Sequence, residues 1–254
     1  MRFSCGRSPA LYEEAVVKAV IQAGGRGMRL RPYTSVLPKP LMPIGARPVL
    51  ELLVKWLRRN GVVELYVTTG YLGHLIRSFC GNGRQWGIQI VYTEEADPLG
   101  TIGPLTLLRK HLTSPFFVLN GDILTDLSLK SFLAQHRSHG GMFTIATTTR
   151  YNKLEYGVIE DRDGVITGFM EKPTLTNSVS MGVYCMQPEI LKHIPSGVPF
   201  GVDDLIHCLM EKNIPVHTYK HGGLWLDIGR VDDFQKAQEI DWDEQAPALL
   251  QAVG

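Results

Sequence analysis

Residues 22 to 40 read QAGGRGMRLRPYTSVLPKP, and this stretch decides how the rest of the chain is interpreted. A largely β-branched run at residues 16 to 22 precedes the three glycines and is typical of a buried strand. Glycine has no Cβ, so backbone N–H groups in such a loop can turn toward a ligand and attract phosphate oxygens. Residues 15 to 50 contain six Lys or Arg and no acid. A loop of this composition predicts a polyphosphate site.

The glycines are also compatible, at first sight, with three other kinds of loop. A Gly-Gly pair after a strand is often only a tight turn, and arginines often serve solubility. A P-loop requires a Gly-Lys pair, which the chain does not contain. A dinucleotide-binding loop requires a third glycine where Leu30 stands, and the prolines at 32, 38, 40 and 43 prevent the regular helix that should follow. The pattern therefore favours a long, irregular phosphate loop of another type.

The composition sets broad limits on the rest. The chain has 254 residues and a net charge of +1, which gives no support to a nucleic-acid-coating role. No apolar stretch has the length of a signal peptide core or a membrane span. The cysteines at 5, 80, 185 and 208 show no C-x-x-C spacing and are interpreted as buried thiols in a reducing compartment. These features predict a cytoplasmic protein that needs no membrane.

Further along, the chain alternates predicted strands and helices. Strands are expected at 62–69, 88–93 and 116–119, with helices at 48–59, 73–80 and 101–111 between or after them. Such βαβ units predict an α/β, Rossmann-like, mostly parallel sheet flanked by helices, with ligands at the carboxyl ends of its strands. A helix at 129–138 follows, and then short strands at 142–149, 158–160, 165–170 and 181–186 predict a mixed-sheet part. The last expected elements are a helix at 202–212, a strand at 216–220 and a helix at 231–240.

Taken together, residues 24 to 51 carry a specific resemblance. The pattern G-G-x-G-x-R-L-x-P-x-T, then P-K-P-L-x-P-I and P-x-L-E, is similar to the opening of the sugar-1-phosphate nucleotidyltransferases, also called nucleotide-sugar pyrophosphorylases. The departure is Met28, where that family usually has Thr or a small residue. The resemblance implies a catalytic domain at residues 16–240, with an N-terminal extension at 1–15 and a C-terminal tail at 241–254. It also implies Mg²⁺ as the cofactor.

Two aspartates are candidate magnesium ligands. Asp122 follows the apolar run 116–119, and Asp227 lies in the apolar segment Leu-Trp-Leu-Asp-Ile-Gly. An acid among apolar residues is costly to bury unless it is paired or binds metal, and Mg²⁺ prefers carboxylates completed by waters and phosphates. A capping role for Asp122, or an ion pair between Asp227 and Arg230, is the simpler alternative. The resemblance implies that both hold the catalytic metal.

The other site residues are implied by the same resemblance. Arg29 and Lys39 neutralise the triphosphate, and Lys172 holds the sugar phosphate. The remaining nucleotide contacts fall on Ala23, Gly24, Gly25, Gly27, Glu94 and Gly100. The remaining sugar contacts fall on Gly157, Glu171 and Gly182. The acidic segment that begins at Glu94 is most similar to the mannose-1-phosphate guanylyltransferase-like branch, and a carboxylate can accept from the N–H groups of guanine.

These observations predict an enzyme that transfers a nucleoside monophosphate from an NTP, preferably GTP, to a sugar 1-phosphate and releases pyrophosphate. Thymidylyl, uridylyl or cytidylyl transfer remains an alternative, as does a catalytically silent homologue that binds nucleotide-sugars. An unrelated α/β binding protein or oxidoreductase is disfavoured by the proline-rich loop. The sequence leaves the sugar open, and it leaves the oligomeric state open, with a homo-oligomer among the alternatives.

Overall fold

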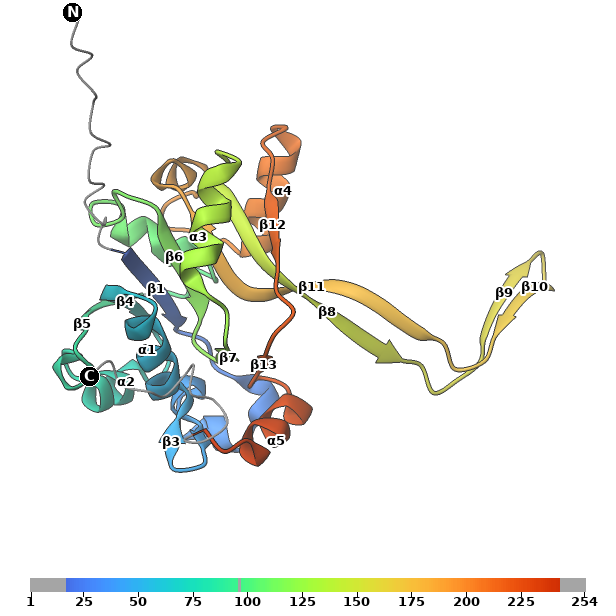
Figure 1. The fold of residues 1–254 in the computed structure, drawn as a ribbon, viewed down its shortest axis with the longest axis horizontal. Coiled ribbons are helices and arrows are strands. Elements are labelled where there is room, and N and C mark those ends of the chain that lie inside the picture. Colours follow the sequence, from blue (N-terminus) through green and yellow to red (C-terminus); the bar gives the residue numbers. More distant parts are fainter. Residues whose placement is uncertain (1–16, 96, 243–254) are drawn as a thin grey trace, which may run out of the picture.

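The computed structural model of the protein describes residues 17–95 and 97–242. Its centre is one seven-stranded sheet in the order β12-β8-β11-β6-β1-β4-β5 (Figure 1). These strands are β1 (Val17–Ala23), β4 (Val62–Thr69), β5 (Gln89–Glu94), β6 (Phe116–Asn120), β8 (Phe143–Lys153), β11 (Thr174–Met186) and β12 (His217–Lys220). Three two-stranded sheets add β2 (Pro43–Ile44) with β3 (Arg47–Pro48), β7 (Ile123–Thr125) with β13 (Trp225–Asp227), and β9 (Val158–Arg162) with β10 (Val165–Met170).

The sheet is parallel in its first half and mixed in its second, which confirms the predicted α/β class. Strands β6, β1, β4 and β5 pair in parallel. Strand β11 then pairs antiparallel with both β6 and β8, and β12 returns in parallel with β8. The mixed part is thus continuous with the parallel part. Because four parallel strands end at one edge, the loops that follow them converge there.

Hydrophobic cores cover both faces of this sheet, because alternate residues of each strand point to opposite sides. Ala19 and Ile21 of β1 join one core, and Val20 between them joins the other. The first core is covered by α1 (Val49–Arg59), α2 (Gly73–Cys80) and α3 (Leu129–Ser138). The second is covered by the 3₁₀ helices η5 (Gly103–Leu108) and η6 (Pro188–His193) and by α4 (Val202–Glu211).

Two details differ from the sequence-based expectation. The helix expected at 101–111 is the short 3₁₀ helix η5, which begins at Gly103, a residue with low helix propensity, and has Pro104 in its first turn. Strands β8 and β11 are longer than the expected 142–149 and 181–186. Helix α5 (Val231–Glu239) closes the described chain, and Trp242 after it is buried and donates its ring N–H to the carbonyl of Ala237 at 2.8 Å. Trp242 of the expected tail therefore packs on the domain, whereas Asp241 is exposed, and residues 1–16, 96 and 243–254 lie outside the described residues.

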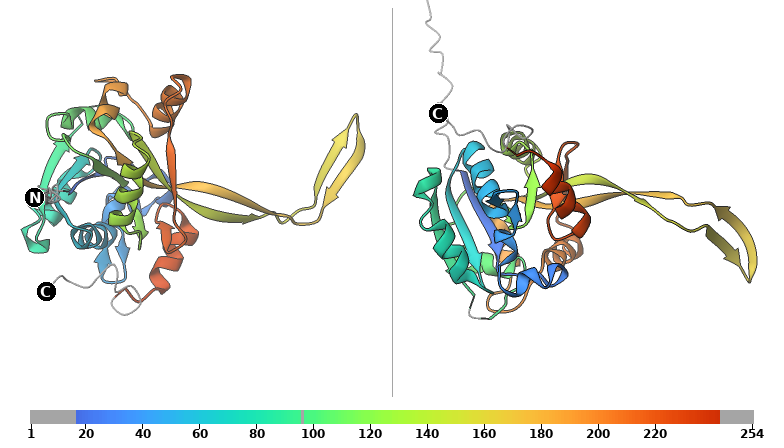
Figure 2. Two further views of the ribbon diagram at one scale, coloured as in Figure 1. Left: turned by 45° about the horizontal axis from the view of Figure 1, so that its top comes forward. Right: turned by 90° about the horizontal axis from the view of Figure 1, so that it is seen from below.

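The extensions of β8 and β11 form a two-stranded arm, defined here as residues 150 to 177. It leaves the body and ends in the β9–β10 hairpin (Figures 1 and 2). Most residues of the arm are exposed. In the described part of the chain, no helix has the length and apolarity needed to cross a membrane.

A buried histidine gives the fold a predictable acid sensitivity. His136 is 0% exposed, and Nε2 accepts from the Gln187 amide at 3.1 Å while Nδ1 lies 2.7 Å from the Thr144 hydroxyl. Burial, with the nearby His139 and His217, lowers the pKa of His136 from 6.5 to about 4. The unfolded chain therefore binds the extra proton between those pH values, so stability is present above pH 6.5 and is lost as the pH falls toward 4.

We expect the low pKa of His136 to lower the unfolding free energy by about 3 kcal/mol as the pH falls from 6.5 to about 4. The measurement is urea unfolding of the wild type and of His136→Gln at pH 7.5 and at pH 4.5. The variant should lose distinctly less stability between the two pH values than the wild type, and His74→Gln, on the exposed face of α2, should behave like the wild type. Equal losses in wild type and His136→Gln would contradict the assignment.

Candidate active site

The loop after β1 is irregular, as its prolines predict. Three single-turn 3₁₀ helices follow one another at Met28–Leu30, Tyr33–Ser35 and Lys39–Leu41. Gly27 has φ +61, and its carbonyl accepts from the Thr34 hydroxyl at 2.8 Å. That bond holds the first turns against each other. The glycines and Arg29 are thereby fixed at the carboxyl edge of the sheet.

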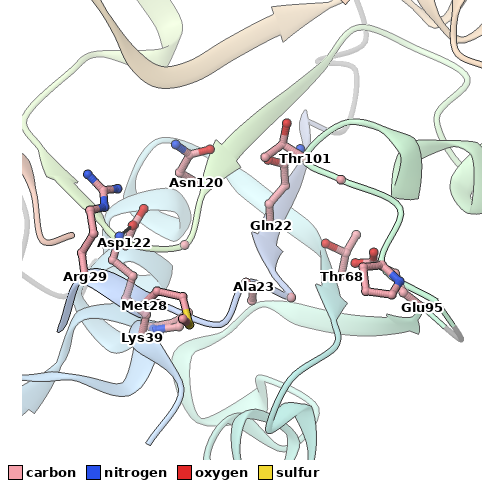
Figure 3. Close-up of a pocket in the computed structure, with 17 residues that line it drawn as sticks. Gln22, Ala23, Met28, Arg29, Lys39, Thr68, Glu95, Thr101, Asn120 and Asp122 are labelled. Carbon is pink, nitrogen blue, oxygen red and sulfur yellow. Dashed lines mark hydrogen bonds and ion pairs between the residues drawn. The ribbon is translucent and has the colours of Figure 1, made fainter. Parts of the chain in front are cut away.

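A cavity of about 470 Å³ lies at this edge (Figure 3). Its walls come from the β1 loop, the ends of β4 and β6, and the segment after β5. The sequence-predicted residues that line it are Ala23, Gly24, Gly25, Gly27, Arg29, Lys39, Gly100 and Asp122. The structure thus gathers most of the predicted nucleotide-binding set around one space.

A row of polar side chains that the sequence analysis did not single out forms one wall of the cavity. Gln22 on β1 is the register partner of Thr68 on β4 and of Asn120 on β6, and all three line the cavity (Figure 3). Both polar atoms of the Gln22 amide are buried and have no hydrogen-bond partner among the described residues. A buried amide without partners costs about 1–3 kcal/mol, which indicates that a ligand completes it. A polar residue near the carboxyl end of a strand that is apolar from Ala19 to Ile21 was the available signal.

The two predicted metal ligands meet through a strand pairing. β13 pairs antiparallel with β7, which places Asp227 opposite Ile123, and the Ile228 N–H donates to the Asp122 carbonyl at 2.8 Å. The ammonium of Lys39 contacts the Asp122 carboxylate and lies 3.8 Å from Oδ1 of Asp227. Lys39 is therefore the cation that pairs with Asp227.

Lys39 is held in a confined space. An added Cβ on Gly229 would collide with its Nζ, so glycine leaves the room that the ammonium occupies. Burial lowers the pKa of Lys39 to about 8, against the attraction of Asp227 and with a smaller contribution from Arg29 in the same direction as burial. The site thus concentrates positive charge beside two carboxylates.

A second layer fixes Asp227. Its backbone N–H donates to Oδ2 of Asp233 at 3.0 Å, and its own Oδ1 accepts from the Gly229 N–H at 2.8 Å. Asp233 is only 1% exposed and is paired with both terminal nitrogens of Arg150. The Arg150 guanidinium lies 4.6 Å from the ring centre of Trp225. The sequence analysis did not predict this layer, because its members are spread over β8, β13 and α5.

The donor set fits a small divalent cation. Mg²⁺ commonly binds one or two carboxylates and keeps waters or phosphate oxygens at its other positions. Asp122 and Asp227 supply two carboxylates, and the ammonium between them shows that this point attracts positive charge. No group of three or more acidic, His or Cys ligands occurs among the described residues, so the remaining ligands would come from water and substrate.

The acidic segment after β5 is placed differently from the expectation. Glu94 is 69% exposed, pairs with Arg77 at 3.0 Å, and does not line the cavity. The next residue, Glu95, does line it. Oε2 of Glu95 accepts from the Leu99 N–H at 2.8 Å, and Oε1 lies 2.8 Å from the position of a Cβ on Gly24. Burial raises the pKa of Glu95, and the bond from Leu99 opposes that shift.

The predicted sugar-binding residues separate into two groups. Gly182 has φ +70 and packs directly against the Asn120 amide, at the edge of the cavity. Gly157, Glu171 and Lys172 lie on the arm instead (Figure 1). The missing Cβ of Gly157 leaves room for the ring of Phe169, and the side chains of Glu171 and Lys172 are 63% and 51% exposed. Within one chain, these three residues do not line the cavity.

Comparison with known proteins places this geometry in context. A family model described as nucleotidyl transferase matches residues 18–244. A UTP–glucose-1-phosphate uridylyltransferase from Synechocystis sp. is 35% identical in an alignment of 243 residues that covers 87% of this chain and 62% of that protein. A mannose-1-phosphate guanylyltransferase catalytic subunit beta from Danio rerio is 35% identical in an alignment of 247 residues that covers 93% of this chain and 68% of that protein.

The fold has solved counterparts as well. The crystal structure of HddC from Yersinia pseudotuberculosis superposes with a TM-score of 0.71 at 25% identity, over 88% of this chain and 98% of that one. The chain spans about three fifths of the length of the uridylyltransferase that it matches. Because the family match covers nearly the whole described chain, from β1 to the residues after α5, the chain belongs to the nucleotidyl transferase family.

Proposed function

We propose that the protein transfers a nucleoside monophosphate from an NTP to a sugar 1-phosphate and releases pyrophosphate. The observation that carries the proposal is the cavity itself, which joins a cation-rich glycine loop to a carboxylate pair at the carboxyl edge of a parallel sheet. The names of the related uridylyl- and guanylyltransferases support the same reaction. The cytoplasmic location stays a prediction from the sequence.

In this proposal the chain contributes position and charge more than proton transfer. Backbone N–H groups of the loop at Gly24 and Gly25 face the triphosphate, and Arg29 neutralises charge that develops on it. Asp122 and Asp227 would hold Mg²⁺, which supplies positive charge to the phosphates when bound. Lys39, which pairs with both carboxylates in the structure, would give up this place to Mg²⁺ and contact a phosphate oxygen instead. A sugar phosphate oxygen then attacks the α-phosphorus in line, and pyrophosphate leaves.

GTP is the proposed nucleotide, and two cavity residues support that choice. The unpartnered Gln22 amide offers one donor group and one acceptor to a base edge. The Glu95 carboxylate, which also lines the cavity, can accept from the two N–H groups of guanine. Glu95 thus takes the part that the sequence analysis gave to Glu94. The relative from Synechocystis sp. is described as a uridylyltransferase, which makes uridylyl transfer the second candidate.

The deciding experiment is pyrophosphate release over a matrix of GTP, UTP, dTTP, CTP and ATP with several hexose 1-phosphates and Mg²⁺. We expect GTP with one hexose 1-phosphate to give the highest kcat/KM. Higher turnover of UTP would reassign the base without affecting the reaction class. Nucleotide-sugar binding without pyrophosphate release in any combination would instead support the silent homologue.

Replacing Gln22 by leucine should separate stability from function. The substitution removes a buried amide that has no partner, so the unfolding free energy should stay the same or rise. The kcat/KM for the preferred nucleotide should fall by about tenfold to a hundredfold, and discrimination between bases should weaken. Steady-state kinetics and urea unfolding measure the two effects. Thr93→Val is the control. The Thr93 hydroxyl is also buried and has no hydrogen-bond partner among the described residues, but it does not line the cavity, so this variant should leave the kinetics unchanged. Unaltered base preference in Gln22→Leu would show that the amide does not read the base.

A further inference from the structure

The arm carries predicted sugar-site residues away from the body of its own chain. Glu171 and Lys172 lie where β10 turns back into β11, and both are more than half exposed. Lys172 also has φ +44, a conformation that costs a non-glycine residue some free energy. The cavity in the body has Arg29 and Lys39, but Lys39 is already paired with two carboxylates. Since the proposed function uses Arg29 for the triphosphate, neither cation is left for a sugar phosphate.

The ribbon that supports the arm is a continuous ladder. β8 and β11 pair residue by residue from Thr147 opposite Ser180 to Lys153 opposite Thr174, without a register shift in that interval. The Leu154 N–H then donates to the Pro173 carbonyl at 3.0 Å. A paired ribbon of this kind resists a sharp fold back onto its own chain, because folding it would break ladder hydrogen bonds. The paired ribbon therefore favours an arm that projects away from the body of its own chain over one that folds back onto it.

The arm also exposes an unusual amount of apolar surface. Among the described residues, half of the exposed large hydrophobic side chains lie on it: Tyr151, Tyr156, Ile159, Val165, Ile166, Phe169, Met170 and Leu175. Tyr156 is 82% exposed and Ile166 is 63% exposed. A cluster of this kind on a soluble protein marks an interaction surface. The arm contains five acids and four Lys or Arg, and one of these cations, Arg150, is paired with Asp233 in the body, so the projecting part carries a small excess of negative charge.

The loop after β1, which forms one wall of the cavity, shows the complementary character. Met28, Tyr33 and Val36 on the β1 loop are 57%, 64% and 76% exposed, and Met28 lines the cavity. The same loop exposes Arg26, Arg29 and Arg31 and contains no acid. Apolar and acidic side chains on the arm thus match apolar and basic side chains on the loop. In the single chain both surfaces remain exposed.

We propose that two copies of this chain exchange arms, so that Glu171 and Lys172 of each copy complete the sugar-phosphate part of the other copy's cavity. In a two-fold dimer, each arm covers the loop of the other copy, so both arms and both loops are buried at the same time. Such a dimer is a closed assembly that adds no further copies. The inference rests on the proposed function in one respect, namely that the completed cavity binds a sugar 1-phosphate. The exchange itself can be tested separately from that activity.

The first test is a pair of complementary variants, Asp122→Asn on the body and Lys172→Ala on the arm, co-expressed with different tags and purified through both. Each variant alone should be nearly inactive. In a mixed dimer with exchanged arms, one cavity combines the intact body with the intact arm, so about half of the wild-type activity per dimer should return. A matched pair, Asp122→Asn with Asp227→Asn, has both changes on the body and should show no recovery.

Mixed dimers that stay as inactive as their parents would overturn the proposal, because each arm would then serve its own chain. Failure to recover any doubly tagged species would overturn it as well. Thermal melts followed by circular dichroism confirm that each variant is folded before activity is compared.

The second test does not depend on activity. Sedimentation of the wild type should give the mass of a dimer, and Tyr156→Ser combined with Ile166→Ser should give the mass of a monomer with an unchanged melting temperature. Leu107→Ser, an exposed apolar position on η5, is the control and should stay dimeric. If the arm variant still sediments with the mass of a dimer, arm exchange is contradicted. If the arm variant is a monomer but the wild type releases no pyrophosphate, the arm exchange is supported and the proposed function is contradicted.

Discussion

Replacing Asp122 or Asp227 by asparagine should reduce the rate of pyrophosphate release by about 10³-fold, since a metal at the phosphates is worth several kcal/mol in the transition state. The two carboxylates flank the same ammonium and are joined by the pairing of β7 with β13. Each amide keeps the volume of the carboxylate but removes its charge. Because the pair acts as one unit, the double variant should lose little beyond the worse single one.

The measurement is kcat at saturating Mg²⁺ for both single variants and the double. The fold should remain nearly intact, with a loss of about 1–3 kcal/mol in unfolding free energy, because Lys39 keeps one partner in each single variant. Asp126→Asn is the matched control, since Asp126 follows the same strand, β7, but pairs with His221 outside the cavity. Nearly full activity in Asp227→Asn alone would make Asp227 a structural partner of Lys39 and would refute a two-carboxylate site.

The local elements of this fold follow from the sequence because they depend on local patterns. The apolar run before Asn120 and the β-branched run before the glycines are strands by composition alone, and the prolines of the phosphate loop exclude a regular helix there. The convergence of both runs at one sheet edge follows from βαβ geometry. These rules suffice to bring the glycine loop and Asp122 together.

The parts that could not be predicted depend on long-range pairing. β13 is only three residues long, which is too short to show a hydrophobic periodicity. Its pairing partner, β7, lies about a hundred residues earlier in the sequence. Lys39 reaches the carboxylates from an irregular loop, whose direction no pattern fixes. Glu94 and Glu95 differ by one position, and in extended backbone that step reverses the direction of the side chain. A single-residue uncertainty therefore decided which acid faces the cavity.

The arm shows a different limit. Its strands were expected at 158–160 and 165–170, and the structure has them at Val158–Arg162 and Val165–Met170. Whether such strands pack on the body or project from it depends on what their apolar side chains contact, and the sequence of one strand does not contain that information. Residues with an expected role in sugar binding can thus be located in the sequence as a motif, while the surface that they face is set by contacts that the motif does not encode.

Arg29→Lys should lower kcat by about 10²–10³-fold, which corresponds to about 2–4 kcal/mol of activation free energy. Arg29 lines the cavity, and its guanidinium can bridge two phosphate oxygens at once, whereas an ammonium offers only a single charged centre. The side chain is exposed, so the substitution should not affect folding. The loss should appear in kcat because the charge on the triphosphate oxygens grows as the bond to pyrophosphate breaks.

The comparison that isolates this effect is steady-state kinetics of Arg29→Lys beside Arg31→Lys. Arg31 is exposed on the same loop but does not line the cavity, so its variant keeps the net charge and the loop composition while leaving the proposed contact intact. Arg31→Lys should show wild-type kcat and KM. If Arg29→Lys instead raises KM and leaves kcat unchanged, Arg29 stabilises bound NTP and the transition state equally, and the charge that accelerates the reaction must come from Lys39 and the metal site.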